Sequence, residues 1–326
     1  MSTMQEMVKG AVSKARNYFG NDVSESRLMA KERKVNEVAH NLQIEREKYE
    51  RAKDMRAVFT YKYERMTVIV AKDLGQGDFK DPIALTDLDK KFAKYYLDAC
   101  QAYDNAKMSA ASGDQANNDP AVIWKDVPQV WKAVFDAIGA GETASPPKVS
   151  VLQALILPMI AHIVHDLPLA IADTLMNEPS QANADDFDRI NELMGGRFNE
   201  IQRQISLRYN WLLILLDGAA LFFDEHIIFQ TIRQERSNAW RDATRLLHAR
   251  YNNDQEKYER IRESIIRRTL VYIAFYRAPS IWWLRLAFWL DHLALRLFMM
   301  LKWPITTSHQ KEQPQTPPEE RPALAA

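Results

Sequence analysis

Apolar residues recur at helical spacing along almost the whole chain, and this pattern limits most strongly what the sequence can fold into. Leu28, Val35, Leu42 and Tyr49 lie seven residues apart on a strongly charged background, and three- and four-residue steps return in the later apolar segments. Only ten glycines occur among 326 residues, and no run alternates apolar and polar residues for long between turn signals. The sequence therefore predicts an all-α fold, a single multi-helix bundle.

Polar and Gly/Pro-rich segments divide the chain into predicted helices. Thr86 followed by Asp89 resembles a capping box that opens one of them. The other predicted helices cover 24–72 (one helix or two in succession), 120–138, 149–177, 185–217, 220–251 and 254–277. We expect four regions, namely a basic amphipathic arm at 1–23, the bundle domain at 24–277, an appended hydrophobic helix at 278–304 and a disordered proline-rich tail at 305–326.

Composition excludes some classes of partner and compartment. Lysine plus arginine and aspartate plus glutamate number 43 each, so no overall positive field favours nucleic acid. Cys100 is the only cysteine, which rules out an intrachain disulfide, and its aromatic-rich surroundings indicate a core residue more than a nucleophile. The first thirty residues lack the pattern of a secretory signal peptide. We therefore expect a cytoplasmic protein.

The stretch AHIVHDLPLAIAD, residues 161–173, places ionisable side chains inside an otherwise apolar predicted helix. On a helix that advances about 100° per residue, His162, Asp166 and Asp173 lie within about 40° of one line, so they share a face. His165 is expected to point away from that face. Pro168 cannot donate a backbone hydrogen bond, so we expect a kink or a new helix start at Asp166, whose carboxylate would cap the second half.

Two interpretations of this stretch are open. An imidazole and a carboxylate four residues apart can hold one divalent metal ion, which makes His162 and Asp166 candidate metal ligands. With Asp173, they are also candidate catalytic residues for acid–base chemistry. The same His162–Asp166 pair can instead form a structural hydrogen bond in a core.

Arg236 is a fourth candidate catalytic residue, in the predicted helix 220–251. Its guanidinium could neutralise Asp166 or Asp173, or bind an anionic group of a ligand in a bidentate fork. The alternative is a surface charge paired with Glu235 or Asp242.

At these residues the chain resembles a family of helical bacterial proteins with a domain of unknown function, whose core signature is A-H-I-N-x-D-L-P-x-A-L. Here the signature reads AHIVHDLPLAI, with Val164 where the family has asparagine and Pro158 where it has glycine. The resemblance spans roughly residues 55–278 and includes blocks at 79–99, 127–138, 185–194 and 236–247. It implies a helical fold and a focus on His162, Asp166 and Arg236, but no reaction. If the family's asparagine contributes to a site, that site is altered here.

Other catalytic templates find less support. The chain has no G-x-S-x-G elbow, no P-loop and no glycine-rich dinucleotide fingerprint. Asp185, Asp186 and Asp188 invite comparison with the aspartate-rich motifs of isoprenoid diphosphate enzymes. They also lie where a helix is expected to begin, where carboxylates are favoured by the helix dipole, and a second such motif is not evident.

The segment APSIWWLRLAFWLDHLALRLFMMLKWP, residues 278–304, has the most unusual composition in the chain. Its apolar arc is too wide for an ordinary surface helix, and Arg285, Asp291 and Arg296 would place several charges in hydrocarbon if it spanned a membrane. An amphipathic helix at a membrane interface is therefore expected, with tryptophans near both ends. Burial against the bundle or in a homodimer is the alternative.

These observations lead to functions of different classes. The first is a peripheral membrane enzyme, metal-dependent in one version, that acts on an apolar or lipid-like small molecule through His162, Asp166, Asp173 and Arg236. The second is a non-catalytic helical scaffold that binds a membrane, a partner or another copy of the chain. A diphosphate enzyme of the isoprenoid type is a third and weaker alternative. A divalent metal ion is the one cofactor that the sequence suggests.

Overall fold

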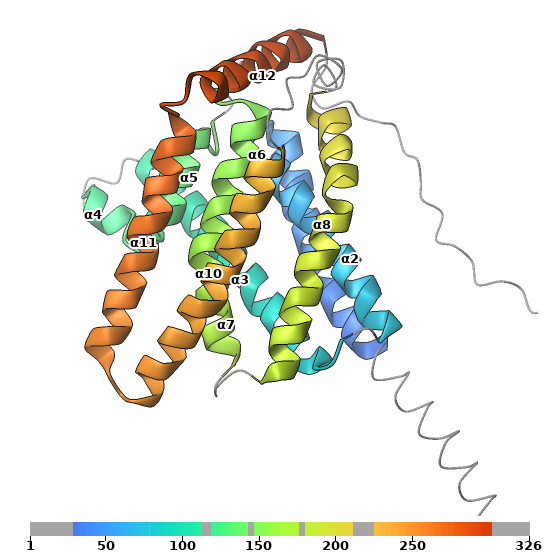
Figure 1. Cartoon of the computed structure of the whole chain (residues 1–326). Coiled ribbons are helices and arrows are strands. Elements are labelled where there is room, and N and C mark those ends of the chain that lie inside the picture. The colour runs from blue at the N-terminus through green and yellow to red at the C-terminus, as the bar shows by residue number, and fades with distance from the viewer. Residues whose placement is uncertain are drawn as a thin grey trace, which may run out of the picture.

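The computed structural model describes residues 29–77, 79–112, 119–142, 147–175, 180–210 and 225–301. Within these ranges the chain is helical and contains no strand, which confirms the all-α prediction (Figure 1). Residues 29–52 form the first helix. The elements that follow are α2 (Arg56–Gln76), α3 (Pro82–Ala111), α4 (Pro120–Ile123), α5 (Gln129–Ile138), α6 (Val151–Ile160), a π-helix (Ala161–Asp166), α7 (Leu167–Thr174), α8 (Gln181–Tyr209), α10 (Glu225–Tyr251), α11 (Gln255–Arg277) and α12 (Trp282–Leu301).

The predicted arm at 1–23 and the predicted tail at 305–326 lie outside the described residues. The expected division of the chain at residues 23, 277 and 304 stays a prediction.

The long helical pattern at the start of the bundle is two helices in succession, the second of the two expected forms. Lys53 has a φ of 56°, so the first helix ends there in a left-handed turn. Asp54 then holds the turn together, because its carboxylate accepts the backbone N–H of Arg56 at 2.9 Å and that of Gly141 at 2.6 Å. The break lets α2 run inward instead of continuing along the surface helix.

The centre of the bundle is the continuous rod made by α6, the π-helix and α7. Helices α2, α11 and α12 contact α6, whereas α3 and α10 contact α7 (Figure 1). Of the described helices, this segment, Val151–Thr174, is the one long and apolar enough to cross a membrane, and all of its most apolar window is buried inside the protein. A helix that is apolar on every side is stable only when neighbours surround it, so the rod is the core around which the other helices pack.

The start of α3 differs from the predicted one. Asp81 is the N-cap, its carboxylate accepting the Ala84 N–H at 3.1 Å, and Pro82 occupies the first turn. Thr86 donates its hydroxyl to the Pro82 carbonyl one turn earlier instead of capping a helix. The predicted capping box of Thr86 and Asp89 is therefore wrong, and the Asp89 carboxyl points into the protein from inside α3.

Helix α12 lies across one end of the bundle (Figure 1). It buries Leu284, Phe288 and Leu295 together with Asp291. The Asp291 carboxylate accepts the backbone N–H of Leu152 at 2.7 Å, so it caps the start of α6 from another helix. One face of α12 is thus packed against the bundle, as the burial alternative expected.

Candidate functional site

A π-helical turn shapes the stretch that carries the predicted site residues. The Leu167 N–H bonds the carbonyl of His162, five residues earlier, instead of the carbonyl four residues earlier. Pro168 explains the widening, since it has no N–H and its ring would clash with the Val164 carbonyl in a regular α-helix. Asp166 has helical backbone angles and makes no side-chain cap, so the predicted capping role of Asp166 is wrong.

The widened turn gathers three N–H donors around the buried Asp166 carboxylate. His162 Nδ1 lies 3.0 Å from Oδ2, His165 Nδ1 lies 2.7 Å from Oδ1, and Trp131 Nε1 donates to Oδ2 at 3.0 Å. The expectation that His165 points away is wrong, because it assumed regular α-helical spacing. Burial alone would raise the pKa of Asp166, but the hydrogen bonds from His162 and His165 outweigh it and hold that pKa below its usual value.

The ionised carboxylate fixes the tautomer of His162. An ionised carboxylate only accepts hydrogen bonds, so the proton of a neutral His162 must be on Nδ1. Burial lowers the pKa of His162 from its ordinary value of 6.5, although the hydrogen bond to Asp166 opposes this shift. Because the pKa is lowered, the ring is neutral at pH 7. Its Nε2 atom therefore carries a lone pair. That atom is buried and has no hydrogen-bond partner among the described residues.

Aromatic rings hold the imidazole in place. Phe92 stacks on His162 with ring centroids 3.5 Å apart and an interplanar angle of 8°, and the Tyr63 ring lies 4.5 Å away. With Nδ1 tied to Asp166 and one face covered by Phe92, the ring orientation is set from two sides. His162 is therefore positioned with its buried Nε2 facing the space beyond it.

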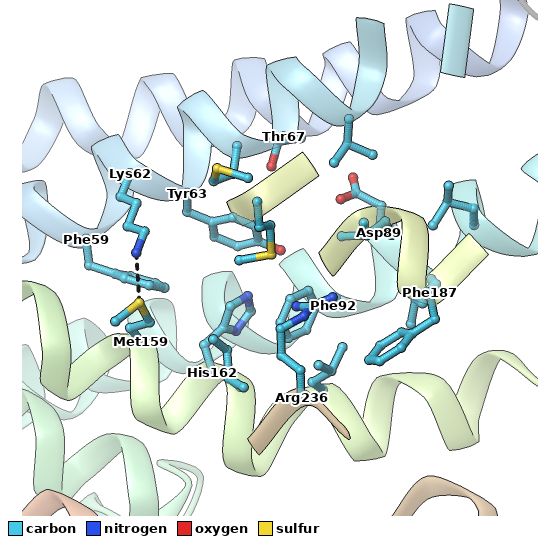
Figure 2. A pocket seen from close by; sticks show the side chains of 18 residues that line it. Phe59, Lys62, Tyr63, Thr67, Asp89, Phe92, Met159, His162, Phe187 and Arg236 are labelled. Carbon is cyan, nitrogen blue, oxygen red and sulfur yellow. Dashed lines mark hydrogen bonds between the residues drawn. The ribbon is translucent and has the colours of Figure 1, made fainter. Parts of the chain in front are cut away.

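That space is an apolar cavity of about 90 Å³ that is lined by α2, α3, α8, α10 and the central rod and is open on one side (Figure 2). Its volume is smaller than the roughly 150 Å³ apolar cavity that accommodates benzene. It therefore fits a small molecule or the end of a longer one. Its apolar wall includes Met66, Val70, Leu85, Leu88, Met159 and Met194.

Several further polar atoms face the same cavity without a partner. The Oδ2 atom of Asp89, the hydroxyl of Tyr63 and the hydroxyl of Thr67 are enclosed and form no hydrogen bond within the described parts of the chain. Figure 2 shows the side chains of Tyr63, Asp89, His162 and Arg236 pointing toward one space. Burial raises the pKa of Asp89 to about 7, so this carboxyl holds a proton in a large fraction of molecules at neutral pH.

Two cationic side chains line the cavity as well. Lys62 is buried, its Nζ lies 2.8 Å from the Met159 sulfur, and burial lowers its pKa to about 8. Arg236 is 5% exposed, and burial lowers its pKa to about 10. The interpretation of Arg236 as a surface charge is therefore wrong. His162, Asp166 and Arg236 do converge, with Arg236 and His162 on the same wall and Asp166 directly behind His162.

Asp173 is not part of this assembly. Its carboxylate accepts the Tyr95 hydroxyl at 2.7 Å and pairs with Arg250 at 2.9 Å, near the surface at the end of α7. It does not line the cavity, so the structure places the predicted catalytic residue Asp173 in a separate ion pair.

No group of three or more His, Cys, Asp or Glu side chains that could hold a metal ion occurs within the described ranges. Both Asp166 oxygens already receive N–H donors, and His162 turns its Nδ1 to them. The metal-binding role of His162 and Asp166 stays a prediction.

The acidic cluster at 185–188 has a structural use. The Asp186 carboxylate accepts the backbone N–H groups of Lys80 at 2.7 Å and of Asp81 at 2.6 Å, and Asp185 pairs with the Lys80 side chain. Helix α8 begins earlier than expected, behind a capping box at Ser180, so the cluster does not cap its start. Asp186 connects α8 to the start of α3 and supports the wall of the cavity.

Sequence reasoning missed the polar groups on α2 and α3. Asp89 lies four residues after Leu85 and three before Phe92, on the apolar line of its helix. A carboxyl group at an apolar position could have indicated a buried acidic residue. Lys62 and Tyr63 lie between Phe59 and Met66 in a segment rich in both charged and apolar residues, so they carried no comparable signal.

A family model supports the resemblance noted in the sequence. No curated protein and no solved structure matches the chain. The model matches residues 35–274, which begins earlier than the resemblance at 55–278 and contains every helix that lines the cavity. The chain belongs to this family, which is described as "Family of unknown function (DUF5995)".

Proposed function

We propose that the cavity is a substrate site, in which the protein binds a small, largely apolar molecule and His162 acts on it as a general base. The observation that carries this proposal is the unpartnered Nε2 lone pair of a neutral histidine, oriented by a buried carboxylate and open to an apolar cavity. A histidine fixed through its other nitrogen by a carboxylate is the arrangement that general bases use.

In this proposal the proton moves from a polar group of the substrate to His162 Nε2. The resulting imidazolium keeps its Nδ1–H on Asp166, whose negative charge stabilises it without taking the proton. Asp89, in its protonated form, supplies a proton to another atom of the substrate and becomes a carboxylate. Burial lowers the pKa of the base, His162, and raises the pKa of the acid, Asp89, on the same cavity. Titratable groups whose environments shift their pKa values in opposite directions are candidates for the base and the acid of one reaction.

A purely structural role for the polar atoms is less favoured. Each buried donor or acceptor without a partner costs about 1–3 kcal/mol, and four such atoms lie around one cavity. A scaffold gains nothing from that cost, whereas a ligand can satisfy these atoms. The metal-dependent version of the enzyme is tested separately, by metal analysis of the purified protein beside its His162→Ala variant.

The proposal is tested with 1-hexanol, a small apolar molecule whose hydroxyl can donate to Nε2. We expect saturable binding, followed by NMR, and a five- to tenfold weaker affinity in His162→Phe, about 1 kcal/mol for one lost hydrogen bond. His165→Phe is the matched control, because it removes the same type of bond to Asp166 from outside the cavity. Equal losses in the two variants, or no binding to the wild type, contradict the proposal.

We also propose that α12 holds the protein at a membrane surface, as expected for residues 278–304. On the face of α12 opposite its packed face, exposed apolar side chains lie along one line of the helix. Trp282 is 74% exposed and Trp289 is 59% exposed. Leu286, Leu293 and Leu297 continue this line. The exposed Arg285 and Arg296 flank it and suit anionic headgroups. This arrangement supports lying in the interface more than crossing the membrane.

A further inference from the structure

Arg236 differs from the other arginines that are buried in the described part of the chain. Arg46 pairs with Glu64 at 2.5 Å, and Arg56 pairs with Asp54 at 2.7 Å. Arg236, in contrast, makes no ion pair with a carboxylate of the described residues, and no neighbouring anion acts on its pKa. Buried charges are normally paired because leaving water is costly, so the missing counter-charge of Arg236 requires an explanation.

The side chain is nevertheless held in a defined position. Its Nε donates to the Asn191 side chain of α8, and its guanidinium lies over the Phe187 ring, 4.9 Å from the centroid. It lines the cavity together with His162, and the two side chains point toward the same space (Figure 2). Burial is the main cause of the lowered pKa of His162, and the positive charge of Arg236 lowers it further. Lys62 adds a second positive charge to the wall.

We infer that the ligand of this cavity is a small aliphatic monocarboxylate whose carboxylate is bound by Arg236, whose chain lies along the methionine-rich wall, and which carries a further polar group as the proton donor to His162. This rests on the proposed function and adds the chemical class of the substrate. A guanidinium is weakly hydrated and presents paired N–H donors that match a carboxylate. Met66, Met159 and Met194 adapt to a flexible chain, and the small cavity favours a carboxylate over a bulkier anion.

The test compares hexanoate, 1-hexanol and hexylammonium, which share one chain and differ in the charge of the head group. For the full-length wild type at pH 7.5, followed by NMR titration, we expect hexanoate to bind at least about tenfold more tightly than 1-hexanol, and hexylammonium to bind most weakly. Arg236→Met should abolish the preference for hexanoate while its affinity for 1-hexanol changes less than twofold. Arg233→Met, which removes an exposed arginine one turn earlier on α10, should keep the preference.

Folding is monitored by the melting temperature of each variant. Because Arg236 has no counter-charge among the described residues, Arg236→Met should melt at or above the wild-type temperature, whereas a structural role for Arg236 would lower it. If 1-hexanol binds but hexanoate is not preferred, or if Arg236→Met keeps the preference, the carboxylate assignment is wrong and the proposed function stands. If none of the three probes binds, both proposals are wrong.

Discussion

Single residues at the cavity are kept in surroundings that disfavour their charge, and Asp89 shows the consequence for stability. The folded protein raises the pKa of Asp89 from 3.8 to about 7, so it binds a proton more tightly than the unfolded chain. The tighter binding of this proton stabilises the folded state, fully below about pH 4, and the stabilisation is lost as the pH rises through about 7.

Asp89→Asn removes this ionisation while keeping the shape of the side chain. We predict that the melting temperature of the variant rises relative to wild type as the pH is raised from 4 to 8, because only the wild type must bury a carboxylate. Circular dichroism melts at pH 4, 6 and 8 measure the difference. Asp98→Asn, at an exposed position on α3, is the control and should show no comparable trend. A difference that is independent of pH would contradict the raised pKa.

The sequence could predict a contact between two site residues where that contact forms in both an α-helix and a π-helix. His162 and Asp166 bond each other in an α-helix and in a π-helix alike, because residues four apart stay on one side in both. His165 and Asp173 were placed wrongly, since the π-turn before Pro168 changes the angle between residues and Arg250 offers Asp173 a closer partner. A π-turn has no reliable signature in local sequence, so the structure was needed to find it.

Among the elements, α12 is attached to the bundle by few polar contacts. Asp291 accepts the Leu152 N–H and the Asn210 side-chain amide, the latter at 3.0 Å, and both partners belong to other elements. The helix boundaries were largely predictable from apolar periodicity, except that the predicted helix 120–138 is wrong, because the structure divides it into α4 and α5, with Pro128 before the second. The contacts of Asp291 were not predictable, because they join residues more than eighty positions apart.

Asp291→Ala should therefore loosen α12 without unfolding the bundle. We predict faster hydrogen–deuterium exchange at backbone amides of 284–297, and unchanged protection in α7, which Asp291 does not contact. Arg285→Ala, at an exposed position of the same helix, is the control for loss of a long side chain. Unchanged exchange in α12 would show that its apolar face alone holds it in place.

For the whole molecule, the exposed apolar line of α12 predicts association with anionic membranes. We expect the full-length protein to sediment with vesicles that contain phosphatidylglycerol, and Trp282→Ser/Trp289→Ser to stay largely in the supernatant, because the tryptophans would enter the interface. Tyr251→Ser, which removes an 87% exposed aromatic side chain from the end of α10, should sediment as the wild type does.

Sedimentation should weaken as salt is raised, since Arg285 and Arg296 contribute by attraction to the headgroups. A wild type that stays in the supernatant but dimerises, with a monomeric double variant, would instead assign the exposed line to a second copy of the chain.

The central claim is that His162 presents an unprotonated Nε2 atom to the cavity while Asp166 holds Nδ1–H, and ¹⁵N NMR of histidine-labelled protein tests it most directly. The imidazole signals of His162 are identified by their loss in His162→Gln. At pH 7 the chemical shifts should be those of a neutral ring protonated at Nδ1, and the ring should take up its second proton below its ordinary pKa of 6.5. A ring protonated at Nε2, or an imidazolium at pH 7, would contradict the account.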